Sequence, residues 1–257
     1  MTVRCERHGG VAHLVLARPD AGNAIDLDVA RALADAATAL SDDRGVRVVL
    51  LRSEGKDFCV GGDLRSFAQV RDLDRHLTEV TTHLHAAIAR LARLDAPVIA
   101  AVQGSAAGAG MSLALGADLV VAAASARFVL AYTRVALSPD GGGSWYLPRL
   151  VGTRRALELA LTNRALSAGD ALEWGLVTRV VPDDALRSEA EALAGELAAM
   201  APGSLAATKR LMRASLGNPL ETQLELESLA LAENARRDGP EGIAAFIEKR
   251  PPAYPAG

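Results

Sequence analysis

Two stretches of small residues decide the fold of this chain: residues 97–110 read PVIAAVQGSAAGAG, and residues 58–64 read FCVGGDL. Each places a loop of small residues after a short apolar run and ahead of a helical pattern, which predicts a strand, a tight loop and a helix. Small residues let a ligand approach the backbone, and N–H groups at the start of a helix lack partners. The two loops can therefore point two N–H donors at one oxygen, although tight turns or close helix packing would explain the same residues.

The rest of the first half alternates short β-rich runs with segments of helical spacing. The expected strands are 11–16, 47–51, 98–102, 119–123 and 128–130. Apolar or small residues follow helical spacing in 27–40, 77–94 and 108–116. Such alternation predicts an α/β fold, in which helical crossovers join parallel strands.

Past Gly152 the pattern is helical almost throughout, in the segments 154–161, 168–174, 184–200, 205–216, 219–236 and 239–249. No repeat or low-complexity linker marks a second independent domain. We expect a core over residues 1–195 and a C-terminal helical region over residues 196–257. Because this region lacks a sheet of its own, we expect it to pack on a partner subunit as well as on its own core.

Composition and charge exclude several classes of protein. The chain has 257 residues, 50% of them hydrophobic and 23% charged, which suffices for a full core without disulfides. A net charge of −3 predicts neither a nucleic acid nor an anionic membrane as partner. The two cysteines, Cys5 and Cys59, show no metal-ligand spacing, so no metal site is expected. No signal-peptide pattern opens the chain, and polar residues interrupt the apolar stretch 98–126, so we expect a cytoplasmic protein.

Several standard motifs are missing from the sequence. The glycines at positions 104, 108 and 110 do not complete G-x-G-x-x-G, because the third position holds Leu113. The chain contains no G-x-x-x-x-G-K-[ST] phosphate loop and no G-x-S-x-G nucleophile turn. Dinucleotide-binding and ester-hydrolase functions therefore lose most of their support.

Taken in order, a series of short segments resembles the crotonase family, also called the enoyl-CoA hydratase/isomerase family. These segments are 58–64, 97–104, 106–110, 117–118, 126–128, 141–144, 147–149, 241–242, 245–246 and 249–250. The resemblance implies a spiral of ββα units as the core, followed by C-terminal helices that build a homotrimer or a hexamer made of two trimers. It also implies an acyl-CoA thioester substrate, with coenzyme A as part of that substrate and no separate cofactor.

The resemblance assigns an oxyanion hole to the backbone N–H groups of Val60 and Ala109. Such donors suit a thioester enolate, whose charge lies on one oxygen, and one donor contributes about 3–4 kcal/mol to transition-state stabilisation in other enzymes. The resemblance also implies that the residues beside these donors contact the substrate or its CoA. These residues are Gly61, Gly62, Asp63, Leu64 and Gly108.

The catalytic carboxylates depart from the hydratase pattern. Typical hydratases of the family carry two glutamates, and the corresponding positions here hold Ser112 and Tyr132. Hydration needs a base for the water and an acid for the α-carbon, so classical hydration is not expected. Asp140, in the loop SPDGGGSW at 138–145, is a different carboxylate. An aspartate directly before a helix is commonly an N-cap, but the resemblance to double-bond isomerases, including ring-opened phenylacetyl-CoA isomerases, favours a catalytic role.

We therefore expect an enoyl-CoA isomerase in which Asp140 removes a proton from C2 and returns it at C4. Tyr132 is expected in the acyl pocket, as a hydrogen-bonding or shape-determining group, or else as a packed core residue. Trp145, Tyr146 and residues 67–82 are candidates for lining the acyl channel.

Other functions stay open at this point. One is an enoyl-CoA hydratase with atypical catalytic residues, to which Ser112 could contribute. Another is a dehalogenase-like enzyme for aryl-CoA, or a thioester hydrolase, in which the loop carboxylate is the nucleophile and His85 the base. A third is a non-catalytic acyl-CoA binding protein, although the acidic residue at position 140 speaks against it.

Two residues near the end of the chain match family positions that reach the CoA of a neighbouring subunit. They are Phe246 and Lys249. An aromatic face suits adenine and a cation suits the 3′-phosphate. An apolar helix face and an ordinary surface lysine would explain the same two residues.

Overall fold

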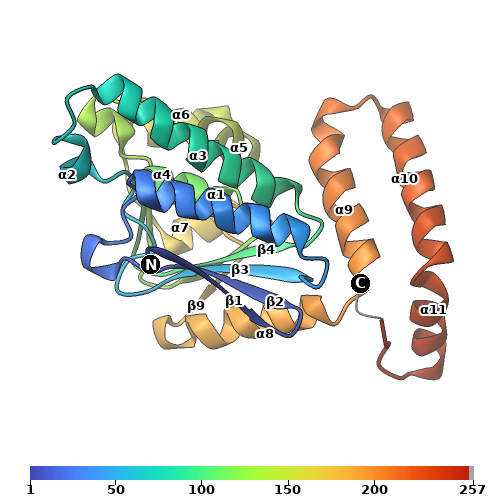
Figure 1. Cartoon of the computed structure of the whole chain (residues 1–257). Coiled ribbons are helices and arrows are strands. Elements are labelled where there is room, and N and C mark those ends of the chain that lie inside the picture. The colour runs from blue at the N-terminus through green and yellow to red at the C-terminus, as the bar shows by residue number, and fades with distance from the viewer. Residues whose placement is uncertain (255–257) are drawn as a thin grey trace.

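The apolar runs of the first half form one six-stranded sheet (Figure 1). Its order is β1 (Val3–His8), β2 (Val11–Leu16), β3 (Val48–Ser53), β4 (Val98–Val102), β6 (Leu119–Ala123) and β9 (Arg179–Val181). β1 pairs with β2 in antiparallel sense, and every following pair is parallel. The structure, a computed structural model, describes residues 1–254.

Helices cover both faces of this sheet. α1 (Leu27–Asp42) and α3 (Leu73–Arg93) pack together on one face, and α8 (Leu186–Ala198) lies on the other (Figure 1). α1 begins at an N-cap, since the Asp26 carboxylate accepts the Val29 N–H at 2.9 Å. The predicted apolar stripe of α1 faces the core. Leu27 is partly buried, and the other predicted positions are buried: Ala30, Leu33, Ala34, Ala37 and Leu40.

A second, three-stranded sheet brings the two decisive stretches together. It joins β5 (Ser105–Ala107), β7 (Arg127–Val129) and β8 (Leu166–Ser167). β5 comes between β4 and α4 (Ala109–Leu115), and a single parallel bridge pairs Cys59 with Ala106. The loop that follows β3 therefore lies beside the loop that follows β4.

Shorter elements connect these parts. They are η1 (Pro19–Ala21), α2 (Leu64–Phe67), η2 (Tyr132–Val135), α5 (Gly143–Val151), α6 (Thr153–Thr162), α7 (Ala168–Glu173), η3 (Asp183–Ala185) and η4 (Ser215–Gly217). The loop between η2 and α5 carries Asp140.

The last three helices stand beside the core rather than on its sheet (Figure 1). They are α9 (Pro202–Ala214), α10 (Leu220–Arg236) and α11 (Gly239–Glu248). α9 is tied to the core by Asp118, which pairs with Lys209 at 2.8 Å and with Arg213 at 2.6 Å. α10 has no buried residue and exposes several leucines, so its apolar side chains have little cover within the described chain.

The predicted α/β fold is confirmed, with corrections at the short strands. The sequence did not predict four of the strands: β1, β5, β8 and β9. The expectation of helices almost throughout after Gly152 is therefore wrong at β8 and β9. β5, β8 and β9 have only two or three residues each, too few to show an alternating pattern, and tertiary pairing makes them strands. The expected boundary between residues 195 and 196 falls inside α8, and residues 255–257 of the expected helical region lie outside the described residues.

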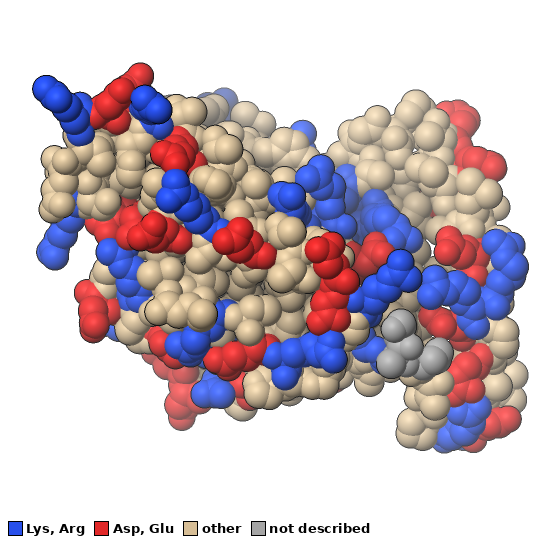
Figure 2. Space-filling view, viewed as in Figure 1, with Lys and Arg blue, Asp and Glu red and all other residues tan. Residues whose placement is uncertain are grey.

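Charged side chains of both signs are interspersed over the face seen in Figure 2. They cover both the core and the last three helices on this face (Figure 2). Within residues 1–254, no helix is long and apolar enough to cross a membrane.

Candidate active site

Backbone hydrogen bonds hold the two glycine-rich loops together. The Cys59 N–H donates to the Ser105 carbonyl at 3.0 Å, and the Ala107 N–H donates to the Cys59 carbonyl at 2.9 Å. A Cβ at Gly110 would overlap the Cys59 carbonyl oxygen. Gly61 has a φ of +100°, and a Cβ there would lie 2.9 Å from the Ala107 carbonyl oxygen. Glycine is therefore required where the two loops touch.

The structure corrects the prediction that Val60 is an oxyanion-hole donor. The Val60 N–H already donates to the Gly22 carbonyl at 3.0 Å, so it is not available to a ligand. A parallel bridge joins Gly62 and Ile25, but its two hydrogen bonds do not use the Gly62 N–H. The Ile25 N–H donates to the Gly61 carbonyl, and the Asp63 N–H donates to the Ile25 carbonyl. The Gly62 N–H itself has no hydrogen-bond partner among residues 1–254.

Ala109 is the second candidate donor. It is the first residue of α4, and the first N–H groups of a helix lack intrahelical partners. Both Ala109 and Gly62 line the same cavity, together with Gly61 and Gly108. Gly62 and Ala109 are therefore candidate N–H donors at this cavity, one from each loop. The sequence predicted Gly62 only as a substrate contact, because the spacing of residues cannot reveal the hydrogen bond between the Val60 N–H and the Gly22 carbonyl.

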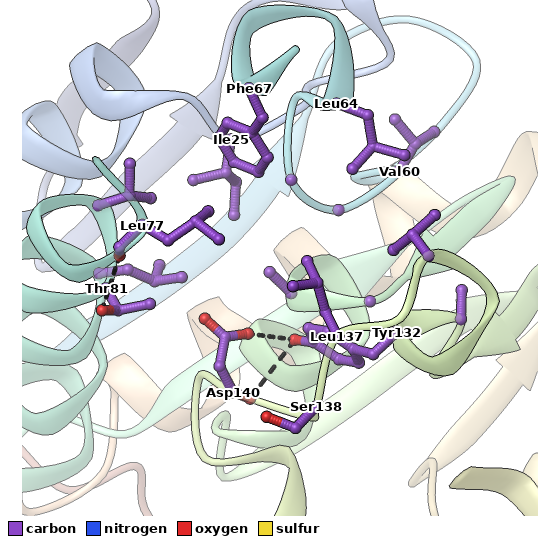
Figure 3. Close-up of a pocket in the computed structure, with 18 of the residues that line it drawn as sticks. Ile25, Val60, Leu64, Phe67, Leu77, Thr81, Tyr132, Leu137, Ser138 and Asp140 are labelled. Atoms are coloured by element: carbon purple, nitrogen blue, oxygen red, sulfur yellow. Dashed lines mark hydrogen bonds between the residues drawn. The ribbon is translucent and has the colours of Figure 1, made fainter. Parts of the chain in front are cut away.

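The cavity has a volume of about 410 Å³ and is mainly apolar (Figure 3). α3 contributes one wall, and the segment after β3 another. The apolar lining residues are Ile25, Val60, Leu64, Phe67, Leu77, Val80, Leu84, Ala109, Ala131, Val135 and Leu137. Several residues of the predicted segment 67–82 thus line the cavity, as does Leu64.

Asp140 lies at the polar end of this cavity and is held by Tyr132 (Figure 3). The Tyr132 hydroxyl donates to Asp140 Oδ1 and lies 3.2 Å from the buried Ser112 Oγ. Burial and the Asp140 carboxylate raise the pKa of Tyr132 far above its usual value, so the phenol remains a donor at neutral pH. Ser112, Tyr132 and Asp140 thus form one connected chain of polar groups.

Asp140 is not the N-cap of the helix that follows it. The N-cap of α5 is Gly142, and no side chain caps that end of the helix. Gly141 and Gly142 have φ values of +59° and +80°, which turn the chain between Asp140 and α5. The carboxylate is therefore free of the structural role that the sequence had left open.

His85 of α3 meets the same loop. Its Nε2 accepts the Gly141 N–H at 3.1 Å and lies 3.8 Å from Asp140 Oδ2. The imidazole is 51% exposed, and the Asp140 side chain 24%. The structure thus brings His85 to the carboxylate, as a dehalogenase-like or hydrolytic site would need.

Asp63, predicted as a substrate contact, is bound within the protein. Its carboxylate caps α2 by accepting the Ser66 N–H at 3.0 Å, and it pairs with Arg18 at 2.9 Å. Burial works to raise the pKa of Asp63, but the Ser66 N–H and Arg18 together hold it below its usual value. Asp63 does not line the apolar cavity, although it borders a neighbouring polar one.

Trp145 lies outside the cavity as well. Its ring packs edge-on against Tyr146, and the Arg149 guanidinium lies 4.1 Å from its centroid. Neither Trp145 nor Tyr146 lines the apolar cavity, and their place in the acyl channel stays a prediction. Trp145 is on the first turn of α5, and 46% of it is exposed.

Phe246 and Lys249 are far along the chain on α11 and just after it, and neither lines the cavity. Phe246 is 86% exposed. Figure 1 places α11 on the opposite side of the molecule from α2, which borders the site. Contact with the CoA of a neighbouring subunit stays a prediction for both residues.

A second, more polar cavity adjoins the first. It has a volume of about 680 Å³ and shares Val60, Gly62 and Leu64 with the apolar one. Arg18 and Arg65 are among its lining residues. Asp20, Asp26 and Asp63 line it as well, and Arg18 pairs with Asp26 and Asp63. Gly62 thus lies where an apolar cavity and a polar cavity with charges of both signs meet.

The chain is an acyl-CoA enzyme of the enoyl-CoA hydratase/isomerase family, whose model matches residues 6–256. It is 39% identical to a 1,2-epoxyphenylacetyl-CoA isomerase of Escherichia coli over 251 residues, which cover 95% of each chain. It is 41% identical to a probable enoyl-CoA hydratase of Rhodobacter capsulatus over 256 residues, 98% of this chain and 97% of that one.

Solved structures agree with this assignment. An enoyl-CoA hydratase from Polaromonas sp. JS666 superposes with a TM-score of 0.93 at 39% identity, covering 98% of this chain and 99% of that one. An enoyl-CoA hydratase from Bacillus anthracis has a TM-score of 0.94 at 32% identity and covers 100% of both chains. The predicted family is confirmed, and its members carry both isomerase and hydratase names.

Proposed function

We propose that this protein is an enoyl-CoA isomerase with Asp140 as its only catalytic acid and base. The observation that carries the proposal is the lining of the apolar cavity. Among the described residues around it, Asp140 is the one carboxylate, and it lies at the same cavity as the Gly62 and Ala109 N–H groups. One carboxylate suffices for a 1,3-proton shift, whereas hydration calls for an acid and a base.

The substrate is divided between the two cavities. The acyl chain occupies the apolar cavity, the CoA portion extends into the polar one, and the thioester carbonyl lies where they meet at Gly62. Placing that carbonyl there brings its oxygen within reach of two backbone donors. CoA is part of the substrate, and a proton shift moves no electrons to an acceptor, so this reaction calls for no further cofactor.

The reaction begins when Asp140 Oδ2 removes a proton from C2 of a 3-enoyl-CoA. Tyr132 occupies Oδ1, and Figure 3 shows the other carboxylate oxygen turned away from Tyr132, toward Thr81 and Leu77. The electron pair of the broken C–H bond moves into the thioester, and the Gly62 and Ala109 N–H groups bind the resulting oxyanion. The electrons then move back from the oxyanion into the acyl chain of the substrate. C4 takes the proton from Asp140, and the double bond comes to lie between C2 and C3.

A ring-derived acyl group is the favoured substrate. The E. coli relative is named a 1,2-epoxyphenylacetyl-CoA isomerase, and it shares 39% of its residues over nearly the whole chain. A cavity of about 410 Å³ with apolar walls accommodates a ring or a medium chain. This support comes from the relative and the cavity together.

A hydratase is the second candidate, because several relatives carry hydratase or dehydratase names. It would need a second acid or base beside Asp140, and Ser112 and Tyr132 fill the positions of the family's glutamates. A dehalogenase-like or hydrolytic reaction has less support. His85 Nε2 accepts the Gly141 N–H, so the ring would have to give up that backbone bond before it could act as a base toward water.

We also propose that the chain forms a homotrimer or a hexamer. α10 exposes leucines and buries no residue, and this is the region expected to contact a partner subunit. In such an assembly Phe246 and Lys249 would contact the CoA of the neighbouring chain. Mass measurement in solution, before and after truncation at Gly239, tests assembly and CoA affinity together.

The isomerase proposal is tested by turnover of a 3-enoyl-CoA and a 2-enoyl-CoA, with thioester products separated by chromatography. We expect the wild type to isomerise the 3-enoyl substrate and leave the 2-enoyl substrate unhydrated. Asp140→Asn should lose about 10²–10⁴-fold in kcat, the usual contribution of a general acid–base group. Hydration of the 2-enoyl-CoA that survives in Asp140→Asn would reject the proposal and favour the hydratase.

A further inference from the structure

His85 is the α3 side chain that forms a hydrogen bond with the Asp140 loop. It lies one helical turn after Thr81, which lines the acyl cavity, yet His85 itself does not line that cavity. Its Nε2 accepts the Gly141 N–H at 3.1 Å. Gly141 has a φ of +59° and directly follows Asp140, so this bond fixes the backbone next to the carboxylate.

The contact between His85 and Gly141 requires one form of the ring. A ring nitrogen that accepts a hydrogen bond carries no proton, so this bond forms with the neutral tautomer that has its hydrogen on Nδ1. Although Nε2 lies 3.8 Å from Asp140 Oδ2, the two groups therefore form no ion pair in this state. Asp140 keeps an oxygen that is bound neither by Tyr132 nor by a cation.

Protonation of His85 would change both contacts at once. Imidazolium has no acceptor nitrogen, so the Gly141 N–H would lose its partner. The charged ring would lie 3.8 Å from Asp140 Oδ2, and a cation at that distance favours the ionised carboxylate and weakens it as a base. The 51% exposure of the His85 side chain gives the ring direct access to solvent protons.

Asp140 is the charged group that this ring faces. On α3, the residues one turn to either side of His85 are Thr81, Thr82, Ile88 and Ala89, none of them ionisable. α4 carries no ionisable residue, and the one cation of α5, Arg149, lies over the Trp145 ring.

The remaining element at this corner is η2. Its two ionisable residues are Tyr132, which is bonded to Asp140, and Arg134, which donates to the Asn163 carbonyl at 2.9 Å. Neither has a contact with His85 in the described chain. Within residues 1–254, Asp140 is the one carboxylate that lies within 4 Å of a nitrogen of this ring.

We propose that His85 is a positioning residue for Asp140, and that its protonation switches the catalytic base off. Neutral His85 holds the Gly141 backbone and leaves Asp140 Oδ2 free for the substrate. Protonated His85 releases the backbone and binds that oxygen. The inference rests on the proposed function, since it concerns the same carboxylate.

The pH dependence of kcat/KM for a 3-enoyl-CoA tests this role with His85→Gln. Glutamine can accept the Gly141 N–H through Oε1, but it does not titrate. We expect the wild-type rate to fall several-fold between pH 8 and pH 5.5, the range in which histidines titrate. In His85→Gln the fall should move to the lower pH at which carboxylic acids titrate, with the rate at pH 8 largely kept.

Two further variants separate positioning from structure. His83→Gln removes a histidine two residues away that has no contact with Asp140, and its acid limb should match the wild type. His85→Ala removes both the acceptor for the Gly141 N–H and the titrating ring. We therefore expect its kcat/KM at pH 8 to be lower than that of His85→Gln. An acid limb that is the same in the wild type and in His85→Gln would overturn the proposal.

The Gly141 amide reports on the same contact without any turnover. In protein labelled with 15N-glycine, we expect its NMR resonance to shift between pH 8 and pH 5.5 in the wild type and to stay in place in His85→Gln. A Gly141 resonance that titrates equally in both proteins contradicts the role of His85. If the wild type isomerises no 3-enoyl-CoA, the proposed function fails, and the Gly141 titration still decides whether His85 controls this loop.

Discussion

The two halves of the candidate site are built in different ways. The donor half, Gly62 and Ala109, consists of backbone N–H groups on loops that backbone hydrogen bonds tie to neighbouring strands. The carboxylate half, around Asp140, is held by side chains, with Tyr132 on Oδ1 and His85 on the next N–H. The donor half therefore depends on chain geometry, and the carboxylate half on side-chain chemistry.

The difference also appears in backbone conformation. In the donor half the positive φ angles fall on glycines, such as Gly61 and Gly108. In the carboxylate half, Ala131 and Ala136 at the two ends of η2 also have positive φ, at 52° and 58°. Alanine adopts this region at a cost of about 1–2 kcal/mol, so the packing around η2 must hold it there.

The largest expected effect comes from breaking the donor half with Gly110→Ala. The new Cβ would overlap the Cys59 carbonyl oxygen, and neither backbone segment can move without breaking strand pairing. We expect a loss of about 3 kcal/mol or more in the free energy of unfolding. Denaturant titration measures it. Gly195→Ala, at an open position on α8, is the control and should stabilise the protein by up to about 1 kcal/mol.

The corrected donor is tested by deleting single N–H groups. Gly62→glycolic acid turns one amide into an ester, and we expect kcat/KM to fall about 10²–10³-fold, as it does for other oxyanion donors. The same change at Val60, with α-hydroxyisovaleric acid, removes the bond to the Gly22 carbonyl. It should cost about 1 kcal/mol of stability and leave turnover nearly intact. The reverse pattern would restore Val60 as the donor.

In the carboxylate half, Tyr132→Phe removes the hydroxyl between Asp140 and Ser112. Ser112 is completely buried, so leaving it without its partner should cost about 1–3 kcal/mol in unfolding free energy. Asp140 loses the bond to Oδ1, and kcat should fall roughly tenfold, the equivalent of about 1.4 kcal/mol. Ser112→Ala keeps the bond between Tyr132 and Asp140, so its loss in kcat should be much smaller. Equal losses in the two variants would show that Tyr132 only packs.

The smallest effect is expected for Asp63→Asn, beside the donor half. Asparagine can still cap α2, so the change removes chiefly the pairing with Arg18. Because the pKa of Asp63 is lowered in the folded state, its charge stabilises the fold above about pH 4 and loses that effect as the pH falls further. We expect a loss of about 1 kcal/mol or less at pH 7.

The pH dependence of the unfolding free energy distinguishes Asp63→Asn from the wild type. Unfolding measured from pH 7 to pH 2.5 should show a smaller acid loss in Asp63→Asn than in the wild type, because the variant has no carboxylate at that position. An unchanged acid profile, or a large loss in kcat, would show that Asp63 acts on the substrate instead.

The sequence predicted the larger elements well, because their signals are local. The apolar stripe of α1, the strands β2, β4 and β6, and the two glycine-rich loops are visible in spacing and composition. Asp140 and Ala109 were also predicted from short motifs, and the structure places both at one cavity. Strands of two or three residues, such as β8, could not be predicted, because pairing partners far along the chain define them.

What the sequence determined by itself is the α/β spiral, the family, and the identity of the one carboxylate in the loop before α5. Only the tertiary structure decided which N–H groups are free, that Asp140 caps no helix, and that His85 meets the Asp140 loop. The physical reason is that hydrophobic periodicity and glycine content report only on the local structure of a few neighbouring residues. A hydrogen bond such as that from Val60 to Gly22, or from Gly141 to His85, joins segments that only folding brings together.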